Sequence, residues 1–132
     1  MSCILRMSGT DFDVDAFIAQ SPAHWNWDIA WYKGETALAN VFRIHDDSGV
    51  QVFAFADPSN APTEPTGEAL QFLKMNHDAL AKLREFPGLE EARLDFYFEE
   101  SDSIKSLEHF PPQLLQLAES LNLRIGITLL EN

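Results

Sequence analysis

Four of the five arginines fall in short segments where apolar and polar residues alternate: Arg6, Arg43, Arg93 and Arg124. In a strand with one buried face, the apolar neighbours would point to the core and the arginines to the other face of the sheet. A guanidinium group binds carboxylate or phosphate in a planar fork, so this open face is a candidate anion site, with Tyr97 on the same side. The alternative is cross-strand pairing of the arginines with Asp95 and Glu99, which would leave a solvated surface.

All three tryptophans lie within seven residues, at Trp25, Trp27 and Trp31. With Ile29 they alternate over four positions, which is typical of a strand, and an ordered aromatic loop fits equally well. Tryptophans on a loop anchor many binding sites, because they bury a large apolar area and keep a polar N–H group. The alternative is that they close one end of the core.

The remaining reactive residues show no spacing typical of a catalytic or metal site. The four histidines are widely separated and Cys3 is the single cysteine, so zinc-site spacings are absent. Asp11, Asp13 and Asp15 have the spacing that opens a calcium loop, but its glycine and final glutamate are missing, which favours a helix cap. No nucleotide-binding or hydrolase motif occurs. We expect no metal and no cofactor; enzymatic activity stays uncertain, and the sequence favours a protein without it.

The charge balance limits the class of partner. The chain has 21 acidic and 9 basic residues, a net charge of −12. This charge would repel nucleic acid and would steer in a basic protein partner. No apolar run is long enough for a membrane helix, and the N-terminal segment is too short for a signal peptide. One cysteine suits a reducing compartment, so we expect a cytoplasmic protein without membrane contact. A homodimer is an open alternative.

The elements that would position these residues follow the order β-α-β-β-α-β-α-β. Alternation predicts strands at residues 2–8, 40–45, 50–56, 92–99 and 123–130, with a sixth in the tryptophan segment if it is extended. Helical periodicity predicts helices at residues 13–20, 67–86 and 112–121. Residues 46–49 favour a hairpin turn, and three prolines make residues 57–66 a stiff loop. Asn76 falls in the apolar stripe of the long helix and therefore needs a hydrogen-bond partner.

These elements predict one α+β domain over residues 1–132, since a chain of 132 residues matches a single domain. The first six elements match a ferredoxin-like β-α-β-β-α-β core, extended by a C-terminal helix and strand. We expect a two-layer sandwich: a five-stranded mixed sheet with the helices mainly on one face. The last strand would be central to stability, with Ile125 and Ile127 almost fully buried.

Short motifs at both ends of the chain carry a family resemblance. They are Ser8-Gly9 after the first strand, Asp13-Val14-Asp15 at a helix start, Pro22, Lys33-Gly34-Glu35 and Pro112-Gln113-Leu114-Leu115. Through them the chain resembles, over most of its length, a family of small bacterial single-domain proteins of unknown function. It departs from the pattern at Ala19-Gln20, where the family has a leucine. The resemblance implies an α+β fold and a bacterial source, and it supplies no catalytic residue.

The sequence favours a non-enzymatic protein-interaction module. Small acidic bacterial domains of this general kind include immunity proteins, so binding of a basic toxin is one concrete form of this hypothesis. The alternative is a small-molecule or anion-binding domain that uses the open sheet face or the tryptophan-rich segment.

Overall fold

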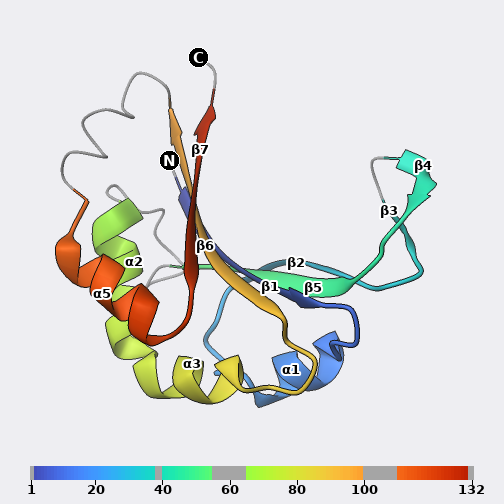
Figure 1. Ribbon diagram of the computed structural model, residues 1–132, viewed down its shortest axis with the longest axis horizontal. Helices are drawn as coiled ribbons and strands as arrows, with labels where there is room; N and C mark the ends of the chain where they lie inside the picture. Colours follow the sequence, from blue (N-terminus) through green and yellow to red (C-terminus); the bar gives the residue numbers. More distant parts are fainter. Residues whose placement is uncertain (1, 38–39, 55–64, 100–109, 131–132) are drawn as a thin grey trace.

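The computed structural model describes residues 2–37, 40–54, 65–99 and 110–130 of the chain (Figure 1). Its centre is a five-stranded sheet in the order β2-β5-β1-β6-β7. The strands are β1 Ser2–Gly9, β2 Trp27–Trp31, β5 Ser48–Phe53, β6 Glu91–Glu99 and β7 Arg124–Leu130. All neighbours are antiparallel except β6 and β7, which are parallel. The α+β class and the five-stranded mixed sheet are therefore confirmed.

Two short strands form an arm that projects from this sheet (Figure 1). They are β3 Thr36–Ala37 and β4 Asn40–Ile44, which pair with each other. The hairpin predicted around residues 46–49 is wrong, because β5 pairs with β1 and β2 and not with β4. Gly49 belongs to β5 itself and is needed there: a Cβ atom at this position would collide with the ring of Trp31.

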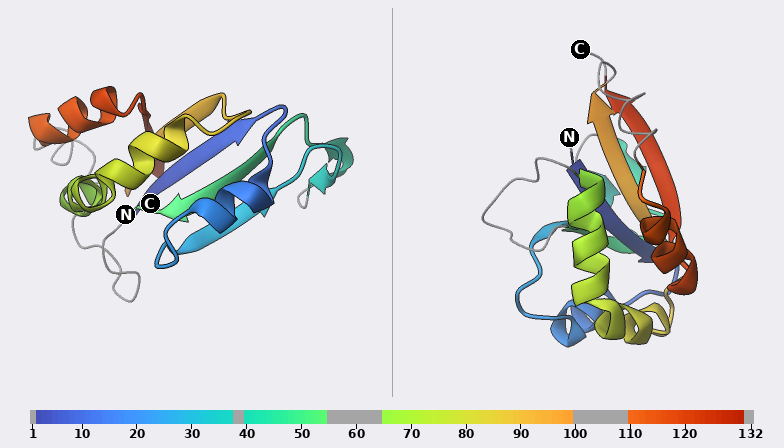
Figure 2. Two further views of the ribbon diagram at one scale, coloured as in Figure 1. Left: turned by 90° about the horizontal axis from the view of Figure 1, so that it is seen from below. Right: turned by 90° about the vertical axis from the view of Figure 1, so that its left-hand side faces the viewer.

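Four helices of the described residues lie on one side of the sheet (Figure 2). They are α1 Val14–Gln20, α2 Pro65–Met75, α3 His77–Arg84 and α5 Pro112–Ser120. Asp13 caps α1 by accepting a 3.1 Å hydrogen bond from the amide of Ala16, so the helix-cap interpretation of the Asp11–Asp15 segment holds. None of the described helices is long and apolar enough to cross a membrane.

The long helix predicted for residues 67–86 is two helices that meet at Asn76. Its expected stripe is buried nonetheless: Ala69, Phe72, Leu73, Leu80 and Leu83. Asn76 is only 5 % exposed, and its side-chain amide donates to the carbonyl of Phe72 at 2.9 Å. Most of the loop predicted for residues 57–66 lies outside the described residues; Pro65 and Thr66 open α2.

The core lies between the helices and one face of the sheet. Leu5, Leu94, Phe96 and Phe98 have no measurable exposure. Ile125, Ile127 and Leu129 follow the same side of the sheet, since β7 pairs in register with β6, yet Ile127 is 43 % exposed. The prediction that Ile125 and Ile127 are almost fully buried is therefore wrong. In the described sheet β7 is an edge strand, so its side chains have strand neighbours on one side only.

Candidate functional site

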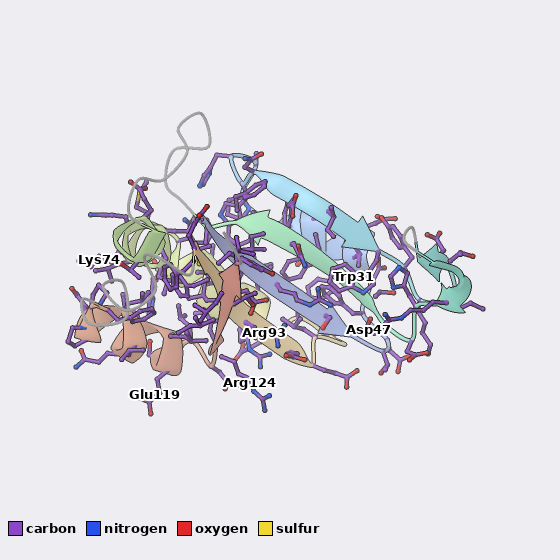
Figure 3. The ribbon with its side chains drawn as sticks, turned by 90° about the horizontal axis from the view of Figure 1, so that it is seen from above. Trp31, Asp47, Lys74, Arg93, Glu119 and Arg124 are labelled. Carbon is purple, nitrogen blue, oxygen red and sulfur yellow. The ribbon has the colours of Figure 1, made fainter. Side chains whose placement is uncertain are left out.

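The candidate site is the face of the five-stranded sheet that the helices leave uncovered, here called the open face (Figure 3). Arg6 lies on it, because its neighbours Leu5 and Met7 are buried on the helix side. Arg6 pairs across to Arg93, and Arg93 pairs across to Arg124. These three arginines, from β1, β6 and β7, form one line across adjacent strands, which we call the arginine row.

Arg93, at the centre of the row, is the arginine with carboxylate partners. Its Nε atom lies 2.7 Å from Asp95 Oδ1 and its Nη1 atom lies 3.5 Å from Glu91 Oε1. Arg93 Nε makes no well-aligned hydrogen bond within the described residues, so its contact with Asp95 is a close ion pair. Asp95 is only 6 % exposed, and it fits because the residue paired with it on β7 is Gly126. A Cβ atom on Gly126 would collide with Asp95 Oδ1.

Arg6, on one side of Arg93, is held without a carboxylate. Its guanidinium carbon lies 4.3 Å from the centre of the Trp31 ring, which is a cation–π contact. With the Gln51 amide oriented to satisfy both neighbours, its oxygen accepts from Arg6 Nη1 at 2.8 Å and its nitrogen donates to Asp28 Oδ2 at 3.2 Å. These contacts fix the orientation of the Arg6 side chain, which forms no ion pair with any carboxylate of the described residues.

Two contacts position the Trp31 side chain, one with its ring face and one with its indole N–H group. Its ring covers Gly49, and its Nε1 atom donates a 2.9 Å hydrogen bond to Asp47 Oδ1. The ring is therefore 7 % exposed although it lies on the open face. Trp31 supports Arg6, and it offers little surface of its own to a ligand.

Arg124, on the other side of Arg93, is exposed. It makes no ion pair within the described part of the chain. Figure 3 shows Arg93 and Arg124 near each other on the β6–β7 side of the sheet, with Trp31 and Asp47 nearer the arm. Within the described residues, two arginines that form no ion pair thus flank Arg93, which forms two.

The other residues predicted for the site lie elsewhere or play structural roles. Arg43 is on β4 in the arm, so the prediction that it shares the sheet face with the other arginines is wrong. Alternation defines the face of a strand but not the sheet to which the strand belongs. Tyr97 is half-buried on the open face. It lies two residues after Asp95 on β6 and pairs with Thr128 of β7.

Trp25 and Trp27 pack at the core. Trp25 is 5 % exposed, and its ring contacts those of Trp27 and Phe72 at 5.6 and 5.5 Å between centres. A groove between the end of α1 and α3 is lined by other residues: Gln20, Ser21, Pro22, Asp78, Ala79, Lys82 and Leu83. The tryptophan segment is the strand β2, with Trp25 just before it. Trp25 and Trp27 pack at the core, as the alternative interpretation had it, whereas Trp31 lies on the open face.

Sequence reasoning missed Gln51 and Asp28 as members of the site. Gln51 carried a signal, because it is a polar residue between Val50 and Val52 and so must face away from the core. Its pairing with Arg6 depends on strand register, which the sequence does not state. Asp28 lies at an irregularity in the pairing of β2 with β5, and no periodic pattern predicts its position.

Carboxylates gather at a different place, around Tyr32. The Tyr32 hydroxyl donates a 2.7 Å hydrogen bond to Asp15 Oδ1. This bond, with the charges of Asp15, Glu35 and Asp13 nearby, raises the pKa of Tyr32. Within the described residues no group of three or more histidine, cysteine, aspartate or glutamate side chains could hold a metal ion.

The fold and the open face define the class of this chain: an α+β domain with an arginine-bearing sheet face. Comparison with protein-family models, with curated proteins and with solved structures gives no match. The family resemblance drawn from the short motifs therefore stays a prediction.

Proposed function

We propose that the protein is a non-enzymatic binding module that recognises an anionic ligand or an acidic protein segment on the open face. The observation that carries the proposal is the arginine row, in which, among the described residues, the central Arg93 has carboxylate partners and the two outer arginines form no ion pair. Like charges directly across a strand pair are unfavourable, so Arg6 and Arg124 beside Arg93 raise the energy of the free protein. A bound carboxylate or phosphate would relieve this repulsion and gain charge-assisted hydrogen bonds.

The geometry of the row favours a ligand with more than one negative group. Adjacent strands are about 4.8 Å apart, so Arg6 and Arg124 are about 10 Å apart at the backbone, with Arg93 between them. A ligand that reaches both would span three strands. Arg6 is already oriented by Trp31 and Gln51, which lowers the entropy lost when a ligand binds.

We also propose that the first six main elements form a ferredoxin-like β-α-β-β-α-β unit in a two-layer sandwich, with α5 and β7 added at one edge. The strand order β2-β5-β1-β6 and its antiparallel pairings support this proposal. In such a unit the sheet face away from the helices is free to bind a partner. We place the protein in the cytoplasm, where the buried free thiol of Cys3 would stay reduced.

A second candidate function is binding of a basic protein partner, of the kind seen in immunity proteins. The net charge of −12 and the carboxylates around Tyr32 favour it. Such a partner would contact Asp13, Asp15 and Glu35 and not the arginine row. Its association would slow as salt rises, because long-range attraction is screened.

The test uses two variants of equal charge. Arg6→Gln with Arg124→Gln removes the two outer arginines of the row, and Arg43→Gln with Lys74→Gln removes two exposed cations outside it. The probes are citrate, inorganic phosphate and poly-L-glutamate, titrated by NMR at about 0.15 M salt, where charges more than about 8 Å away are screened.

We expect amide shifts in β1, β6 and β7 for the wild type and the control pair, and their loss in the row variant. Equal shifts in both variants would contradict the proposal. Binding of poly-L-lysine at the amides near Tyr32, with no response to the anions, would support the basic partner instead.

A further inference from the structure

The two edges of the described sheet are built differently. At one edge, β2 has an irregularity in its pairing between Trp27 and Ile29, and the charged Asp28 lies in it. Irregular pairing and charge are the usual means by which an edge strand avoids adding another strand. At the other edge, β7 pairs with β6 through all seven of its residues without any shift.

β7 also has side chains suited to further pairing. Ile127, Leu129 and Leu130 are 43, 51 and 42 % exposed, and the strand contains neither proline nor lysine. In the described part of the chain its backbone pairs with β6 alone, so the hydrogen-bonding groups on its outer side are unpaired. A long, regular and apolar edge of this kind is a template for an added strand.

The side chains on the two faces of β7 indicate which residues an added strand should contain. On the helix side, Ile125, Ile127 and Leu129 present apolar surface, so an added strand needs apolar residues there. On the open face, Arg124 ends the arginine row and forms no ion pair with the described residues, so the residue placed across from it should be an acid. Because side chains alternate along a strand, one segment of alternating apolar and acidic residues meets both requirements.

We propose that β7 accepts an extended acidic segment of a partner protein as a sixth strand, with a carboxylate of that segment opposite Arg124. This inference rests on the proposed function, because it names the kind of partner that the arginine row recognises. The carboxylate would continue the row of paired positions Arg6, Arg93 and Arg124 by one strand, and the apolar side chains would cover Ile127 and Leu129.

A second copy of the chain fits this edge less well. In an antiparallel pair of two β7 strands, residues on the same face must meet, and the described strand from Arg124 to Leu130 contains no acid. Within the described strand, each Arg124 would therefore have no carboxylate opposite it in such a dimer. Charge complementarity thus favours an acidic segment from another protein.

The test uses three capped heptapeptides that match the length of β7. One alternates valine and glutamate, one alternates valine and lysine, and the third is the valine–glutamate peptide with N-methyl groups on alternate amides. N-methylation removes backbone donors without changing the side chains, so it isolates strand pairing from simple charge attraction. Binding is followed by hydrogen exchange of the β7 amides and by titration, with analytical ultracentrifugation of the free protein in parallel.

The expected result is protection of outward-facing β7 amides by the valine–glutamate peptide and by neither of the others. Arg124→Gln should weaken that binding by up to about fivefold, whereas the exposed control Arg43→Gln should leave it unchanged. The amides of β2, at the blunted edge, should exchange as in the free protein.

Four results would overturn the proposal. The valine–lysine peptide could bind as well as the valine–glutamate peptide, or no peptide could protect β7. The free protein could also be a dimer with β7 already protected, which would assign the edge to a second copy. If the N-methylated peptide binds equally well and shifts the amides near Arg6 and Arg93 but not β7, strand addition is wrong while anion binding at the open face stands.

Discussion

Trp25 Nε1 donates a 2.9 Å hydrogen bond to Asn76 Oδ1 inside the core, at the point where α2 ends and α3 begins. The Asn76 amide in turn donates to the carbonyl of Phe72, so both ends of its side chain are satisfied. Asn76 has φ −112° and ψ 16°, outside the helical range, and this residue separates the two helices. The bond thus ties the segment before β2 to the joint between two helices.

Asn76→Ala should destabilise the fold by about 1–3 kcal/mol, because it leaves the buried Trp25 N–H group without an acceptor. Urea unfolding monitored by tryptophan fluorescence measures the change, and the exposed Gln71→Ala on α2 is the matched control. Trp25→Phe and Asn76→Ala together should cost less than the sum of the two single changes. Strict additivity would show that the bond contributes nothing beyond the two side chains.

The main elements could be predicted because their burial is periodic. Leu94 and Phe96 alternate with polar residues, and the stripe from Ala69 to Leu83 repeats at helical spacing. The break at Asn76 could not be placed, since its partner Trp25 lies 51 positions earlier in the chain. Sequence spacing required a partner for Asn76 without identifying it.

For the site, the sequence likewise predicted the face of each strand but not the register between strands. Alternation along each strand placed Arg6, Arg93 and Arg124 on one face, and this holds in the structure. Their alignment in one row depends on register between strands far apart in sequence, which alternation does not encode. For the same reason Ile127 and Phe96 look alike in sequence, yet one lies on an edge strand and the other inside the sheet.

Leu94→Ala should cost about 2–5 kcal/mol, because Leu94 is fully buried on a strand with neighbours on both sides. Ile127→Ala should cost about 1 kcal/mol or less, since its side chain is 43 % exposed. Urea midpoints of the two variants and the wild type measure the difference. A larger loss for Ile127→Ala than for Leu94→Ala would mean that β7 is covered in solution by a further copy or segment.

Stability should fall at high pH because of Cys3. Burial raises the pKa of the Cys3 thiol well above its ordinary value of 9.0, and the Asp95 carboxylate adds to the rise. The folded state therefore keeps a proton that the unfolded chain releases. Stability is unaffected by Cys3 below about pH 9 and declines as the pH rises above it.

Urea unfolding of the wild type and Cys3→Ala at about pH 8 and about pH 10 tests this linkage. The wild type should lose more stability between the two pH values than Cys3→Ala does. Tyr32→Phe is measured alongside, because the bond to Asp15 also raises the pKa of Tyr32 and so adds a decline in the same direction. Identical losses in the wild type and Cys3→Ala would show that the thiol ionises equally well in the folded protein.

Gly126→Ala tests the packing that supports the centre of the arginine row. The new methyl group would collide with Asp95 Oδ1 and lie 3.3 Å from Arg93 Cδ, so the ion pair must shift. We expect a loss of about 1–3 kcal/mol. In a strand without such a collision, alanine in place of glycine stabilises by about 0.5–1 kcal/mol, because glycine loses more backbone freedom on folding.

Whether Gly126→Ala stabilises or destabilises the fold should therefore depend on Asp95. In an Asp95→Ala background the space beside Gly126 is empty, and Gly126→Ala should become neutral or stabilising. Unfolding of the two single variants and the double variant gives this coupling directly, with Thr128→Ala as a control on the same strand and face. If Gly126→Ala destabilises equally with and without Asp95, the glycine serves the backbone of β7 and not the Arg93–Asp95 pair.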